Sequence, residues 1–177
     1  MDLDLRPLAA VLVSLLAAVL LPLVDRRPTV RETITITAAV LKLALVLSML
    51  PAVLTGQGVE GVSLALGMGL SLQFRVDALG LIFALTASSL WLLTSIYSIG
   101  YLRATASTHQ TSYYSAFAVC LSATIGIAFS ANLLTFFVCY EVLTLATYPL
   151  VVHDRTPEAL AAGRRYLVYT LAAGQAL

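Results

Sequence analysis

Long apolar stretches recur along the chain and are separated by short polar ones. An α-helix rises about 1.5 Å per residue, so roughly twenty apolar residues cross a hydrocarbon core about 30 Å thick. The last stretch begins within HDRTPEA at 153–159, where Thr156 suits a helix cap and Pro157 the first helical position. The pattern predicts an all-α polytopic membrane protein whose single membrane domain, 1–177, has about six transmembrane helices, at 7–24, 33–54, 78–99, 113–129, 132–152 and 158–177.

The sixth predicted helix is too short to finish a crossing. Arg164 and Arg165 favour the aqueous boundary, and the residues from Tyr166 to Leu177 make only about 18 Å of helix. We therefore expect the chain to be the N-terminal part of a larger bundle, or a split subunit.

A segment with the periodicity of a β-strand lies between the second and third predicted helices. Every second residue from Val62 to Val76 is apolar, and Gly67 and Gly69 stand at the centre of this stretch. Alternation of this kind predicts a short β-hairpin at 62–76 with one apolar face, lying on the membrane surface or against another subunit. An irregular interfacial loop is the alternative, because a lone hairpin is marginal without something to pack on.

The distribution of basic residues predicts the orientation. Seven arginines fall on one side of the predicted spans and only two, Arg6 and Arg75, on the other; the seven are Arg26, Arg27, Arg31, Arg103, Arg155, Arg164 and Arg165. Cytoplasmic loops carry the excess of basic residues, so the N-terminus and the hairpin are expected outside.

The amino-acid composition and the absence of known motifs reduce the number of functions that the chain could have. Hydrophobic residues make up 60% of the chain and charged residues 11%, and no basic tract for nucleic acid occurs. Cys120 and Cys139 lie within predicted spans without metal-ligand spacing, and we find no phosphate loop, iron–sulfur motif or hydrolytic motif. We therefore predict no cofactor, no metal site and no catalytic residue, and leave open whether the chain belongs to an enzyme complex.

One carboxylate, Glu141, lies at the middle of an otherwise apolar span. An acidic residue at the centre of a helix costs about 3 kcal/mol to insert, which the neighbouring Leu, Val and Phe residues offset. A desolvated carboxylate tends to hold its proton and a nearby cation favours the ionised form, so Glu141 is a candidate proton-translocation site. The alternative is a neutral acid hydrogen-bonded to a neighbouring helix for packing alone.

Four residues are candidate relays or partners of this acid. Lys42 lies ten residues into its span, at a depth similar to that of Glu141, and either pairs with it or extends its stem to a headgroup or water pocket. Thr144 and Tyr148 share the helical face of Glu141, as hydrogen-bond relays or as packing contacts. His153, like His109, lies in a predicted loop, either solvated or delivering protons.

Four segments between residues 60 and 177 resemble a known family. RVDALGLIFAL at 75–85, YSIGY at 97–101, NLLTFFVCYEVLTLATYPLV at 132–151 and the RRYLVYTL of the last helix are similar, in that order, to the antiporter-like subunits of Mrp-type cation/proton antiporters, respiratory complex I and membrane-bound hydrogenases. The stretch from Asn132 looks most like the D-type subunit of Mrp antiporters. The resemblance implies about fourteen helices with two inverted five-helix repeats, and a proton-channel glutamate on helix five, which matches Glu141. The family's lysine on helix seven has no counterpart here.

The resemblance implies a proton or cation/proton translocating subunit in a bacterial or archaeal inner membrane, such as the D-type Mrp subunit or its counterpart in NADH:quinone oxidoreductase. Its expected partners are the lipid bilayer, other membrane subunits, and protons with or without sodium. Two alternatives stay open: a non-transporting scaffold of a membrane-bound hydrogenase or NADH dehydrogenase, and a quinone-contacting subunit that needs a redox partner.

Overall fold

The computed structural model describes residues 4–56, 58–67, 69–104, 110–153 and 155–175, and these form six α-helices and one β-hairpin. This confirms the predicted fold class of a helical polytopic membrane protein. The elements are α1 (Arg6–Leu20) with a 3₁₀ turn η1 (Leu21–Val24), α2 (Pro28–Leu54), β1 (Val59–Gly67), β2 (Leu70–Val76), α3 (Ala78–Ala104), α4 (Gln110–Ala128), α5 (Leu133–Val151) and α6 (Pro157–Gly174).

Five helices of the described chain are long and apolar enough to cross a membrane: α1 with η1, α2, α3, α4 and α5. The sixth, α6, contains Arg164 and Arg165 and is not among them. A short turn at Ser130 to Asn132 precedes α5. The predicted cap of α6 is confirmed because the Thr156 hydroxyl accepts a hydrogen bond from the Ala159 N–H.

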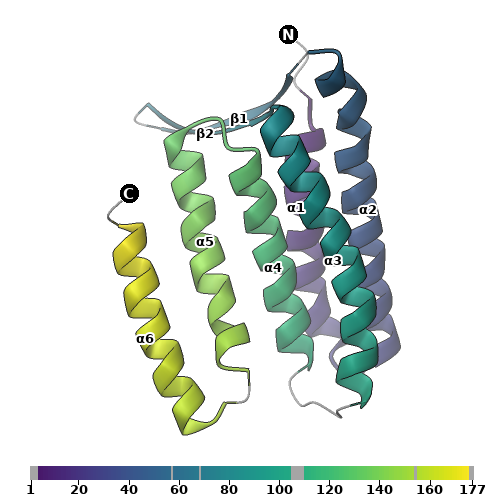
Figure 1. Ribbon diagram of the computed structural model, residues 1–177, viewed down its shortest axis with the longest axis vertical. Helices are drawn as coiled ribbons and strands as arrows, with labels where there is room; N and C mark the ends of the chain where they lie inside the picture. Colours follow the sequence, from purple (N-terminus) through teal and green to yellow (C-terminus); the bar gives the residue numbers. More distant parts are fainter. Residues whose placement is uncertain (1–3, 57, 68, 105–109, 154, 176–177) are drawn as a thin grey trace.

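The helices run side by side in two groups (Figure 1). The first four form a closed ring, in which α1 packs on α2, α2 on α3, α3 on α4 and α4 on α1. Helix α5 packs on the outside of this ring against α4, and α6 packs on α5 at the edge of the molecule. This arrangement separates the interior of the ring from the α5–α6 contact.

The predicted hairpin is confirmed, and it packs on the end of its own bundle. Strands β1 and β2 pair antiparallel, with Val59 opposite Val76. Val59, Phe74 and Val76 are buried with Leu81 and Phe129 in one apolar cluster. The outer edge of β2 also bonds the turn between α4 and α5, since the Arg75 N–H donates to the Phe129 carbonyl oxygen at 2.8 Å. The apolar side chains of Leu64, Leu66 and Leu70, towards the tip, are exposed.

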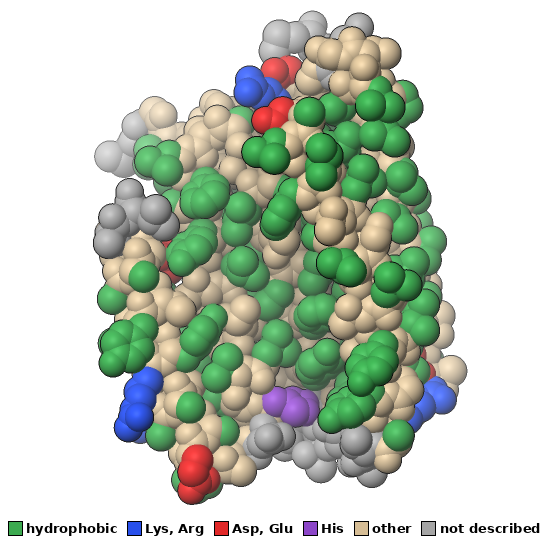
Figure 2. Space-filling view, in the orientation of Figure 1, with side chains coloured by type: hydrophobic (Ala, Val, Ile, Leu, Met, Phe, Trp, Pro, Cys, Tyr) green, Lys and Arg blue, Asp and Glu red, His purple; other side chains and the backbone are tan. Residues whose placement is uncertain are grey.

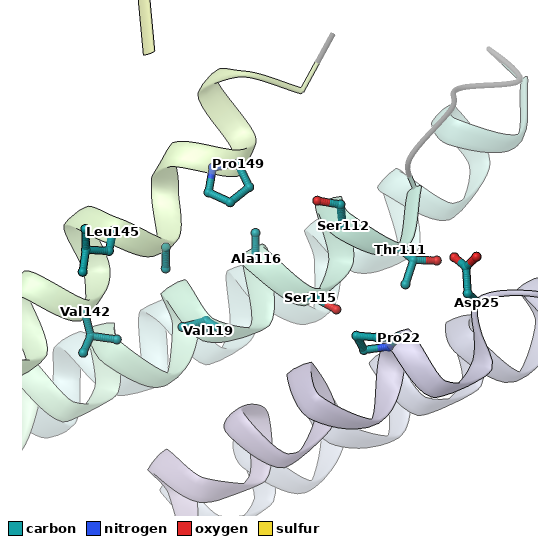
Figure 3. Close-up of a pocket in the computed structure, with 11 residues that line it drawn as sticks. Pro22, Asp25, Thr111, Ser112, Ser115, Ala116, Val119, Val142, Leu145 and Pro149 are labelled. Atoms are coloured by element: carbon teal, nitrogen blue, oxygen red, sulfur yellow. The ribbon is translucent and has the colours of Figure 1, made fainter. Parts of the chain in front are cut away.

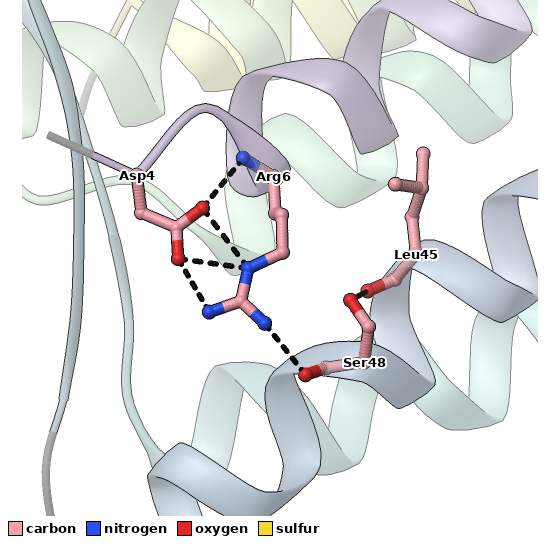
Figure 4. Close-up of polar contacts among 4 residues, drawn as sticks. All are labelled: Asp4, Arg6, Leu45 and Ser48. Carbon is pink, nitrogen blue, oxygen red and sulfur yellow. Dashed lines mark hydrogen bonds and ion pairs between the residues drawn. The ribbon is translucent and has the colours of Figure 1, made fainter.

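Polar contacts at this hairpin end hold the beginning of α1 and the residue Asp4 before it against α2 (Figure 4). The Arg6 guanidinium donates to both carboxylate oxygens of Asp4, and its Nη1 donates to the Ser48 carbonyl oxygen of α2 at 2.7 Å. The hydrogen bond from Arg6 holds the pKa of the Asp4 carboxyl below its ordinary value.

The opposite end, which we call the basic end, carries the seven arginines counted above. Most charged side chains on the face shown in Figure 2 lie towards the two ends, with apolar side chains between them. Two residues of α2 are buried there: Arg31 donates to Thr111 at 3.0 Å and to Gln110 at 2.5 Å, and Glu32 pairs with Arg103. These contacts join α2 to α3 and α4.

Candidate functional site

Glu141 is the ninth residue of α5, about 12 Å along the helix from Leu133. The helix begins where the Asn132 side chain accepts a hydrogen bond from the Thr135 N–H at 2.8 Å, and the Asn132 amide donates to the Ser71 carbonyl oxygen at 2.8 Å. One side chain therefore caps α5 and ties it to the hairpin. Glu141 is the charged residue of α5, and Leu, Val and Phe residues make up much of the rest of the helix.

The carboxyl group of Glu141 is directed at α6. A Cβ atom placed on Gly174 would lie 2.6 Å from Glu141 Oε1, closer than side chains approach one another in proteins. Only glycine allows this approach. Oε1 is buried and has no hydrogen-bond partner among the described residues. The structure thus places one carboxyl oxygen at a helix interface without a fixed donor.

A second glycine of α6 makes the same kind of contact nearer the C-terminal end of α5. A Cβ on Gly163 would lie 2.3 Å from a methyl carbon of Val152 and 2.9 Å from a ring carbon of Tyr148. Gly163 and Gly174 are eleven residues apart, about three turns, so they share one face of α6. Glu141 and Tyr148, predicted to share a face of α5, both meet this face.

A hydroxyl pair that sequence reasoning missed also joins the two helices. Thr147 Oγ1 and the Tyr166 hydroxyl oxygen lie 2.7 Å apart. The spacing of the two glycines is the signal that identifies the inner face of α6, but it does not show which residue of α5 Tyr166 meets. Thr144 is buried, and its hydroxyl donates to the Tyr140 carbonyl oxygen within α5.

Lys42 and Glu141 are not brought together. Lys42 is fully buried inside the α1–α4 ring, where Nζ donates to Ser14 Oγ at 2.5 Å and to the Leu121 carbonyl oxygen at 3.1 Å. Its Nζ also lies 4.9 Å from the centroid of the Trp91 ring. The side chain therefore does not extend to a headgroup region. Two ion pairs, Asp4–Arg6 and Glu32–Arg103, form between described residues, and neither includes Lys42 or Glu141.

His153 follows α5 at the basic end, and its ring meets the Tyr113 ring edge-on at a centroid distance of 5.9 Å. It is thus placed beside α4, six residues beyond Thr147 along the chain. His109 lies outside the described residues.

A groove of about 780 Å³ runs along the other side of α5, between it, α4 and the end of α1 with η1 (Figure 3). Asp25, Thr111 and Ser115 line its polar part. Leu145 and Pro149 of α5 line the apolar part, and Pro149 has no N–H to donate to the Leu145 carbonyl oxygen. The groove thus extends from the basic end to Val142, the neighbour of Glu141.

The fold and this site define a multi-pass membrane protein with a buried carboxyl group between two helices. No protein-family model matches the sequence, and no curated protein matches it. A solved structure with the same fold is that of the membrane-bound sulfane sulfur reductase, an archaeal respiratory membrane complex. One of its chains superposes with a TM-score of 0.79 at 20% identity, over 94% of this chain and 25% of its own length. The chain therefore shares the fold of part of that neighbouring chain and spans about a quarter of its length.

Proposed function

We propose that this chain forms part of a proton-translocating, antiporter-like subunit of a multisubunit membrane complex, of the D-type Mrp or NADH:quinone oxidoreductase kind, and that Glu141 is its proton-loading site. The observation that carries the proposal is the position of Glu141 Oε1, which is buried in the middle of a span without a hydrogen-bond partner among the described residues. A carboxyl oxygen that no donor holds can take or release a proton as α5 and α6 rearrange.

Two further features support this role. Pro149 leaves the Leu145 carbonyl oxygen of α5 without its usual helical donor, and the groove beside Pro149 reaches from the basic end to Val142; in this proposal water enters along that groove. The hydroxyl pair of Thr147 and Tyr166 lies on the inner face of α6, between the basic end and Glu141. In this proposal Thr144, Tyr148 and His153 are candidate proton relays. The basic end is proposed to face the cytoplasm because seven of the nine arginines lie there.

The test is proton uptake by proteoliposomes that contain the complete complex. We expect Glu141→Gln to reduce uptake at least tenfold and Glu141→Asp to retain part of it, because aspartate keeps the carboxyl group. Glu158→Gln is the matched control, since Glu158 is exposed at the start of α6 and should leave uptake unchanged. Repeating the measurement with and without sodium identifies the coupled ion.

The outcome that contradicts the proposal is specific. If Glu141→Gln transports normally and the amount of assembled complex falls instead, the chain is a scaffold subunit. Assembly is measured on the same preparations by quantifying the partner subunits that copurify.

A further inference from the structure

One face of α3 carries a row of buried polar atoms that nothing in the Glu141 site uses. Ser88, Trp91, Ser95 and Ser98 are spaced three, four and three residues apart, so they share a face, and each is less than 5% exposed. Three of their polar atoms, Ser88 Oγ, Trp91 Nε1 and Ser95 Oγ, have no hydrogen-bond partner among the described residues. Buried polar groups in proteins are nearly always hydrogen-bonded, to protein or to water.

The row connects two features of the bundle. Trp91 lies against the Lys42 ammonium. Ser98 Oγ lies 3.2 Å from the Tyr113 hydroxyl oxygen, and both residues line a cavity of about 430 Å³ near the basic end, together with His153. Ser88 and Ser98 are about 15 Å apart along the helix axis, so the row extends from this cavity to the depth of Lys42 and beyond it.

The buried side chains around the middle of the row are mostly small. The buried cluster that contains Trp91 has Leu121 and five alanines as its other buried members, and Val13, Ile34, Leu92 and Phe117 are among the larger side chains that pack against it; the alanines are Ala17, Ala18, Ala38, Ala39 and Ala118. Each serine hydroxyl and the indole N–H supply polar partners at successive turns, which is what ordered internal water requires. Burying any one of these groups without a hydrogen-bond partner, either protein or water, would be unfavourable.

Lys42 has no ion-pair partner in the described part of the chain. The other titratable or charged groups on the helices packed around it are Arg6 on α1, Arg31 and Glu32 on α2, Tyr97, Tyr101 and Arg103 on α3, and Tyr113, Tyr114 and Cys120 on α4. The carboxylate among them, Glu32, is paired with Arg103 at the basic end. We therefore assign proton exchange at Lys42 to water molecules rather than to a carboxylate.

We propose that the α3 face formed by Ser88, Trp91, Ser95 and Ser98 is a hydrated passage that makes Lys42 a second protonatable site, in contact with the basic end and independent of Glu141. Lys42 Nζ gives one proton to an adjacent water and becomes a neutral amine, and the proton passes along the waters to the cavity at Ser98 and Tyr113. The reverse transfer restores the ammonium, which the Ser14 hydroxyl, the Leu121 carbonyl oxygen and the Trp91 ring stabilise.

Silver ions, which react with thiolates in water-filled spaces, test the passage in membrane vesicles that contain the full chain. The background carries Cys120→Ala and Cys139→Ala, and protected thiols are counted by maleimide labelling after unfolding. We expect Ser95→Cys to react at least tenfold faster than Ile96→Cys, its neighbour on the exposed apolar surface. Equal, slow reaction at both positions would show a dry face and overturn the proposal.

A second pair of variants tests the connection to Lys42. Lys42→Cys should also react quickly, and adding Ser95→Leu, which fills the face with an apolar side chain, should slow that reaction at least tenfold. Rapid reaction that Ser95→Leu does not change would place the route to Lys42 elsewhere and overturn the proposal.

Hydroxyl-radical labelling tests the passage in the unsubstituted protein, so a folding defect caused by a substitution does not affect the result. Hydroxyl radicals formed from water by a brief X-ray exposure should oxidise Trp91 at least tenfold faster than Leu93, which is exposed on the apolar surface, after correction for the intrinsic reactivity of each side chain. Similar corrected rates would contradict the passage. None of these measurements involves transport or Glu141, so failure here leaves the proposed function untouched, and loss of transport in Glu141→Gln leaves the passage untouched.

Discussion

Gly174→Ala tests whether Glu141 meets α6 as the structure shows. The added Cβ would lie 2.6 Å from Glu141 Oε1 and 2.9 Å from Tyr140 Cε1, whereas ordinary van der Waals contact begins at 3.4 Å. Either the two side chains or the end of α6 must therefore move by several tenths of an ångström. Overpacking of this kind typically destabilises a protein by about 1–3 kcal/mol.

The higher helix propensity of alanine opposes this destabilisation. Alanine is favoured over glycine in a helix by up to about 1 kcal/mol, so the net change in the free energy of unfolding ranges from near zero to about 2 kcal/mol of destabilisation. Gly100→Ala is the matched control, because Gly100 also lies within a helix and a Cβ there has no neighbour within 4 Å. We expect the control to be stabilised by up to about 1 kcal/mol.

The assay is denaturant unfolding in mixed micelles, combined with infrared spectroscopy of the carboxyl C=O stretch. The band is assigned to Glu141 by its loss in Glu141→Gln, and Gly174→Ala should shift it because Oε1 changes surroundings. Stabilisation of Gly174→Ala equal to that of Gly100→Ala, with an unmoved C=O band, would refute the contact between Glu141 and α6.

Three further variants test separate contacts. Asn132→Ala removes the cap of α5 and should lower the free energy of unfolding by about 1–2 kcal/mol in the same assay. Tyr166→Phe removes the hydroxyl bonded to Thr147 and should cost about 0.6–1.5 kcal/mol; no loss would show that the bond contributes nothing. Asp4→Asn should cost up to about 1 kcal/mol at neutral pH. Because Arg6 lowers the pKa of Asp4 in the folded state, this stabilisation is present above the unfolded value of about 3.9 and is lost as pH falls through the folded value, so wild type and variant should converge in acid.

Much of the fold was accessible from the sequence, because its signals are local. Apolar length predicted the five helices that are long and apolar enough to cross a membrane, alternation predicted the hairpin, and the Thr156 cap was correctly placed. The boundaries were less accurate: α2 begins at Pro28 rather than at 33, because Arg31 and Glu32 are buried against α3 and α4 instead of remaining in a loop.

Part of the candidate site could likewise be predicted from the sequence, and part depends on the tertiary structure. The depth of Glu141 in its span follows from the chain alone, since hydropathy and helical rise are properties of one segment. Its approach to Gly174, the bond between Thr147 and Tyr166, and the enclosure of Lys42 by the first four helices depend on which helices become neighbours. That choice is made by packing of small residues between segments far apart in the chain, and no periodicity within one segment encodes it.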